Sequence, residues 1–110
     1  MLGVEPRRYG SYATKSYLKA KNEEAYANVF TVHYPDEERE AGRPLRQAPC
    51  YDRLKKLGAV FGAKFGWERA NFFAKEGEKP KDDWSFRRSK WFKNVEQECK
   101  NVKENVGLLD

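Results

Sequence analysis

The stretch FGAKFGWER, from Phe61 to Arg69, decides the fold of this chain. Apolar residues occupy every second position of it: Phe61, Ala63, Phe65 and Trp67 alternate with Gly62, Lys64, Gly66 and Glu68. A period of two is typical of a β-strand with one face on a core, and the alternate glycines leave room for another backbone, a ring or a ligand. The sequence therefore predicts a strand over 61–67, with Trp67 continuing the core face.

Helical patterns lie on the N-terminal side of this strand. Tyr51–Leu57 predicts a short helix that ends at Gly58, a residue type enriched just past helix ends. Thr14–Phe30 carries an imperfect apolar stripe of about four turns, for which Ser11 or Thr14 is the expected N-cap. Helices therefore precede the strand.

The clearest amphipathic pattern lies near the C-terminus, with Ser89 as the predicted N-cap and Gly107 as the predicted residue past its end. Its apolar positions recur every three or four residues: Trp91, Val95, Cys99, Val102 and Val106. Together these patterns predict an α+β fold, a small incomplete fragment with two or three helices and a short antiparallel strand element. Its aromatic rings are expected to be incompletely covered.

Two polar stretches connect these elements. Residues 36–49 are rich in charge and proline, which predicts a surface connection, and residues 75–83 predict a mobile loop. Arg43 and Arg46 lie in the first stretch. Their guanidinium groups would either clamp carboxylates of a neighbouring domain or form the exposed ion pairs that are common on protein surfaces.

Composition limits the function classes. At 110 residues the chain is long enough for about one small domain. Its net charge of +5 would favour phosphate-rich partners, but acidic and basic residues alternate without a long basic run. No stretch approaches the roughly 20 apolar residues of a membrane span. We therefore expect neither nucleic acid nor membrane as a partner, and keep a basic nucleic-acid-binding module as the weaker alternative.

Nothing in the sequence assembles a catalytic or metal site. The two cysteines lack CxxC spacing and His33 is the one imidazole, so neither a zinc site nor an activated thiol is expected. No G-x-G-x-x-G or phosphate-loop pattern is present, so the fragment alone is expected to bind no cofactor. Trp67, Glu68 and Arg69 are the candidate polar contacts, for an amine or an anionic group, against the alternative that they order the local structure.

Several stretches follow one another in an order that resembles the dimethylglycine/sarcosine dehydrogenase family of FAD-dependent amine oxidoreductases. These stretches are Glu5–Gly10, Tyr34–Arg39, Ala41–Pro44, Leu57–Phe65, Trp67–Arg69, Ser85–Phe92 and Val106–Asp110. The family usually has proline and a second tryptophan where this chain has Ala70 and Phe72. Losing that proline frees a backbone dihedral at the corresponding position.

The resemblance implies a fragment of a larger flavoprotein. Residues 1–10 would be the tail of a flavin domain, 11–84 the central domain, and 85–110 the start of an aminomethyltransferase-like folate domain. The parent would use FAD to oxidise dimethylglycine or sarcosine and pass a one-carbon unit to tetrahydrofolate, in the bacterial cytoplasm or the mitochondrial matrix. This fragment would connect the flanking flavin and folate domains and would not be an enzyme alone. A non-catalytic regulatory or interaction subunit of the same architecture is the alternative.

Overall fold

The computed structural model describes residues 10–107, which contain three helices and two strands. In chain order these are α1 (Lys15–Ala27), α2 (Tyr51–Lys56), β1 (Ala59–Lys64), β2 (Trp67–Phe73) and α3 (Trp91–Glu104). The strands form one antiparallel hairpin. The predicted α+β class, with up to three helices and a short antiparallel strand element, is confirmed.

The predicted single strand over 61–67 is wrong, because the chain reverses within it. Lys64 pairs with Trp67, which leaves Phe65 and Gly66 as a two-residue connection. Both have positive φ, 51° and 83°, as the type I′ turn of a tight hairpin requires. The reversal takes Phe65 and Trp67 off the expected core face, and their exposed fractions are 80% and 47%.

The hairpin carries the small core. Ala59 and Val60 on β1 and Phe72 on β2 are the buried apolar residues among residues 10–107. The pairing register shifts between Val60 and Phe61, so that Asn71 is an extra residue on β2 and forms a β-bulge.

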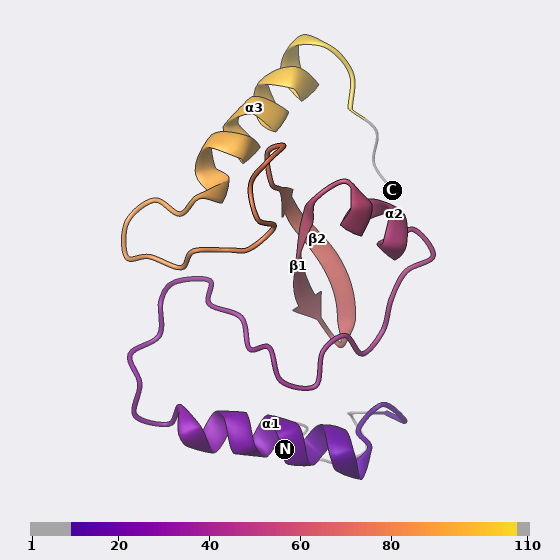
Figure 1. Ribbon diagram of the computed structural model, residues 1–110, viewed down its shortest axis with the longest axis vertical. Coiled ribbons are helices and arrows are strands. Elements are labelled where there is room, and N and C mark those ends of the chain that lie inside the picture. Colours follow the sequence, from indigo (N-terminus) through magenta and orange to yellow (C-terminus); the bar gives the residue numbers. More distant parts are fainter. Residues whose placement is uncertain (1–9, 108–110) are drawn as a thin grey trace.

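Helices α2 and α3 both contact the hairpin. The ring of Tyr51, the first residue of α2, lies 4.4 Å from the ring of Phe61. On α3 the buried Asn94 donates from Nδ2 to the carbonyl of Phe73 at 2.8 Å, which attaches this helix to the end of β2. Figure 1 shows α3 at one end of the molecule, α1 at the other, and the hairpin with α2 between them.

The ends of α3 differ from the prediction. Lys90, not Ser89, is the N-cap and makes no side-chain cap bond, while its backbone N–H donates to Asp83 Oδ1 at 3.0 Å. The C-cap is Asn105, so the first residue past the helix end is Val106, one residue before the predicted Gly107. Cys99 is exposed, so the predicted stripe is covered only over its first turns.

Helix α1 begins as predicted and ends early. Thr14 is the N-cap, and its Oγ1 accepts a hydrogen bond from the backbone of Tyr17 at 3.3 Å. The helix ends at Ala27 and none of its residues is buried. Tyr17 is half-buried, with its ring 5.8 Å from that of Tyr12, whereas Tyr26 and Phe30 are 84% and 96% exposed, so only the start of the apolar stripe is covered within residues 10–107.

Candidate functional site

The segment 36–46 wraps around the hairpin and makes the closest polar contacts in the described part of the chain. At the edge of β2, the backbone N–H of Arg46 donates to the Gly66 carbonyl at 2.9 Å, and the Glu68 N–H donates to the Arg46 carbonyl at 2.8 Å. These two bonds make Arg46 a one-residue parallel partner of Trp67. The segment thereby pairs with an otherwise open strand edge.

The same segment reaches the opposite edge of the hairpin. Ala63 stands across from Glu68 in the register, so both backbone N–H groups point away from the hairpin. Glu38 Oε2 accepts the N–H of Ala63 at 2.6 Å, and its Oε1 accepts from the bulge residue Asn71 at 3.3 Å. One short segment therefore satisfies backbone donors on both edges.

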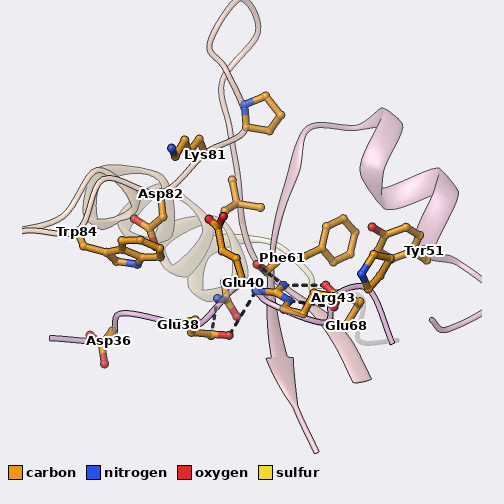
Figure 2. A pocket seen from close by; sticks show the side chains of 14 residues that line it. Asp36, Glu38, Glu40, Arg43, Tyr51, Phe61, Glu68, Lys81, Asp82 and Trp84 are labelled. Carbon is orange, nitrogen blue, oxygen red and sulfur yellow. Dashed lines mark hydrogen bonds and ion pairs between the residues drawn. The ribbon is translucent and has the colours of Figure 1, made fainter. Parts of the chain in front are cut away.

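Arg43 ties the middle of the segment to the hairpin. Its Nε and one terminal nitrogen donate to the two carboxylate oxygens of Glu68, at 3.0 and 2.7 Å, and the terminal nitrogen also donates to the Phe61 carbonyl at 2.9 Å. A paired fork of this kind fixes direction as well as distance. Glu38, Arg43, Arg46 and Glu68 are called the junction cluster below, and Figure 2 shows three of them as labelled sticks.

The central ion pair is largely buried. The side chain of Glu68 is 3% exposed and that of Arg43 is 16% exposed. The hydrogen bonds that Arg43 donates to Glu68 raise the pKa of the Arg43 guanidinium above its usual value, against the lowering effect of burial. A buried carboxylate without this partner would be strongly unfavourable, so the two residues depend on each other.

The guanidinium of Arg46 lies near two aromatic rings. Its guanidinium carbon lies 4.6 Å from the centre of the Tyr12 ring and 5.7 Å from that of Trp67. A guanidinium near two ring faces gains cation–π attraction. This arrangement brings the region just before α1 together with the start of β2.

A cavity of about 350 Å³ opens beside Arg43 and Glu68. The aromatic rings of Tyr51, Phe61 and Trp84 form apolar walls of this cavity. Carboxylates dominate its polar lining, and the acidic residues are Asp36, Glu38, Glu40, Glu68 and Asp82. Oδ1 of Asp82 is buried without a hydrogen-bond partner. Burial raises the pKa of that carboxyl, and the charges of Asp83, Asp36 and Glu38 raise it further, against a lowering bond from the Asp83 backbone.

This lining does not fit the cofactors that the resemblance implies. FAD carries a diphosphate and tetrahydrofolate carries carboxylates, and both would meet the negative side chains of the cavity. No glycine-rich turn between a strand and a helix, the cradle that a diphosphate needs, is present among residues 10–107. We therefore assign no FAD or folate contact to these residues.

The structure does not gather the three predicted contact residues into one group. Glu68 is buried and bound to Arg43, whereas Trp67 and Arg69, its neighbours along β2, are exposed. Successive residues of a strand point to opposite faces, so Glu68 cannot share a ligand face with them. Arg69 lines an adjoining cavity of about 300 Å³ with Trp91 and Val95, which shares Asp36, Glu38, Asn71 and Asp82 with the first cavity. Their role as ligand contacts stays a prediction.

Sequence reasoning missed Glu38 and left the role of Arg43 open between a clamp and an exposed pair. In the structure Arg43 forms a buried pair with Glu68 of the same chain, and a clamp on a neighbouring domain stays a prediction. A sequence signal existed in Gly62, since an added Cβ there would meet the carboxylate of Glu38 and the amide of Asn71. An alternate glycine in a strand indicates the close approach of another group, but not which one.

His33 lies outside the junction cluster. His33 is exposed, and its ring lies within 3.1 Å of the Arg39 guanidinium and 3.9 Å from Glu37. Within residues 10–107 no group of three or more His, Cys, Asp or Glu side chains is arranged to hold a metal ion. None of the helices in this range is long and apolar enough to cross a membrane.

Two family models divide the chain at the junction cluster. Residues 1–48 match the FAD dependent oxidoreductase central domain, and residues 50–110 match the GCVT N-terminal domain. The protein is therefore a segment in which a flavoprotein central domain is followed directly by a GCVT-type domain. The second match begins at residue 50, whereas residue 85 is the start of that domain predicted from the resemblance.

Similar proteins fit this class. A 4-methylaminobutanoate oxidase (formaldehyde-forming) of Paenarthrobacter nicotinovorans is 38% identical over 97% of this chain and 13% of its own length. Human mitochondrial dimethylglycine dehydrogenase is 39% identical over 100% of this chain and 13% of its own length. Human mitochondrial sarcosine dehydrogenase is 33% identical over 73% of this chain and 9% of its own length. The chain belongs to the dimethylglycine/sarcosine dehydrogenase family, and it spans about an eighth of the length of the first two relatives.

Proposed function

We propose that this chain is the connecting segment of a longer FAD-dependent enzyme that demethylates an N-methyl amine, dimethylglycine or sarcosine, and passes the one-carbon unit to tetrahydrofolate. The observation that carries the proposal is the order of the two family matches, 1–48 and then 50–110, within one continuous chain. The flavin and folate domains of the same polypeptide are its proposed partners, and residues 1–10 its proposed link to the flavin domain. A bacterial cytoplasm or a mitochondrial matrix is the proposed location.

The role proposed for the segment is mechanical. FAD supplies the oxidising chemistry in such an enzyme, and protein groups place it and the substrate. The residues described above bind neither cofactor in this proposal. They set the position of the central domain relative to the GCVT-type domain. The buried pair of Arg43 and Glu68, 2.7 Å apart, supports a fixed position over a loose linker.

The direct test uses a full-length protein that contains this chain. Purified protein is expected to hold FAD, and anaerobic addition of dimethylglycine or sarcosine is expected to bleach its visible flavin absorption. With tetrahydrofolate present, the methyl carbon should appear as a folate adduct and less as free formaldehyde. A full-length protein that binds no flavin, or whose flavin no N-methyl amine reduces, contradicts the proposal and favours the regulatory subunit.

A second measurement tests the role given to the segment itself. The 110-residue chain is expected to retain no FAD in equilibrium dialysis, because residues 10–107 contain no glycine-rich turn between a strand and a helix that could cradle a diphosphate. Micromolar binding of FAD to this chain alone would contradict a purely connecting role.

A further inference from the structure

The contacts of the junction cluster cross from one family match to the other. Glu38, Arg43 and Arg46 lie within residues 1–48, and their partners Phe61, Ala63 and Glu68 lie within residues 50–110. Helix α1 is joined to the same segment, since Glu24 Oε1 accepts the backbone N–H groups of Glu40 and Ala41 at 2.8 Å each. Residues of the first match therefore contact residues of the second match through the segment 36–46.

The contact is specific on both sides. Arg43 uses a fork on both oxygens of Glu68 and a further bond to a backbone carbonyl, which lysine could not reproduce. Gly62 lies directly under the carboxylate of Glu38, where any side chain would displace it. The segment contacts backbone groups on both edges of a two-stranded hairpin, an element that is marginal alone.

We propose that the junction cluster is an interdomain clasp, through which the central domain recognises the β1–β2 hairpin of the GCVT-type domain and holds the two domains in one relative position. Arg43 is the positioning residue. The acidic cavity beside it is formed by residues of both domains, so it exists only while the clasp is closed. This inference rests on the proposed function, because it assumes that the two family matches are parts of separate domains in one longer protein.

Amide hydrogen exchange on a full-length protein that contains this chain tests the clasp. The amides of Arg46 and Glu68 report on the β2 edge, and the amide of Ala63 reports on the β1 edge. Arg43→Gln and Glu68→Gln are each expected to speed exchange at the β2-edge amides by about tenfold or more, since each leaves a charged or polar group without its partner. The double variant should add little to either single variant.

A milder variant guards against loss of the fold. Glu38→Ala acts from the partly exposed outer edge and is expected to speed exchange at Ala63 alone, with α3 unchanged. The matched control is Glu78→Gln, whose partner Lys90 lies 3.7 Å away within the same family match. That variant should leave the amides of Arg46, Ala63 and Glu68 unchanged.

The outcomes separate the two proposals. Unchanged exchange at Arg46, Ala63 and Glu68 in the Arg43, Glu68 and Glu38 variants overturns the clasp, whatever the activity of the protein. Absence of flavin reduction by N-methyl amines overturns the proposed function, and the exchange rates still decide the clasp. If both proposals are right, the Arg43→Gln protein should keep its flavin reduction rate and release a larger share of formaldehyde.

Discussion

At the scale of single residues, Asp82 combines a buried, unpartnered oxygen with a pKa raised by burial. A carboxyl whose pKa is higher in the folded than in the unfolded state disfavours folding when it is ionised. Its cost is therefore present above the folded pKa and disappears as the pH falls below the unfolded value of 3.8. The carboxylates of Asp36 and Glu38 in the acidic cavity add to this cost, because they repel the negative charge of an ionised Asp82.

Asp82→Asn is accordingly expected to stabilise the protein at pH 7 by under about 1 kcal/mol, since the side chain is only partly buried and water screens it. The gain should shrink on acidification and vanish below the unfolded pKa. Thermal unfolding between pH 3.5 and pH 7 measures this, with Glu76→Gln as the control that removes one exposed charge from the same loop. A gain that stays constant over this range would contradict the assignment.

At the scale of elements, the two-residue turn between β1 and β2 stores strain in its first residue. Phe65 has a φ of 51°, a left-handed conformation that costs a residue with a Cβ about 1–2 kcal/mol. Asparagine tolerates this conformation and glycine follows it here, so the sequence would become the favoured Asn-Gly pair. Phe65→Asn is expected to stabilise the hairpin by about 1 kcal/mol, measured as slower amide exchange across β1 and β2.

Gly66→Ala provides the opposite test at the same turn. Its φ of 83° disfavours a side chain, and a new Cβ would lie 3.0 Å from Leu45 Cδ2. The variant should destabilise the hairpin by about 1–2 kcal/mol. If both variants weaken the hairpin equally, the ring of Phe65 has a packing role that outweighs the strain.

Local sequence patterns predict the helices of this fold but not the turn between β1 and β2. The short helix before Gly58, the Thr14 cap and the helix from Trp91 follow from local preferences, and all three are present. The sequence predicts one strand here because the apolar alternation continues through Phe65 and Trp67, and Phe-Gly lacks the usual turn signature. The Arg43–Glu68 pair joins residues 25 positions apart, and no local pattern encodes such a contact.

At the scale of the whole molecule, residues 10–107 bury few apolar side chains. Ala59, Val60 and Phe72 are the buried ones, and the described chain leaves 12 large hydrophobic residues exposed. The radius of gyration is 16.5 Å, against about 13 Å for a compact domain of this length. Exposed rings at this density are typical of a surface that another part of a protein covers. The chain also spans only 13% of relatives such as human dimethylglycine dehydrogenase.

We therefore expect this chain to be weakly folded alone and firmly folded within a longer protein. Amide exchange of β1, β2 and α3 should be at least about a hundredfold faster in the 110-residue chain than in the full-length protein, because opening free energy falls when apolar burial is lost. The control is Thr14→Ala in the full-length protein, which should loosen only α1, by about 1 kcal/mol, through loss of its cap. Equal protection of the hairpin in both proteins would mean that three buried apolar residues and the junction cluster suffice to hold the fold. In that case the exposed rings of Phe30, Tyr26 and Phe65 would need an explanation other than missing neighbours.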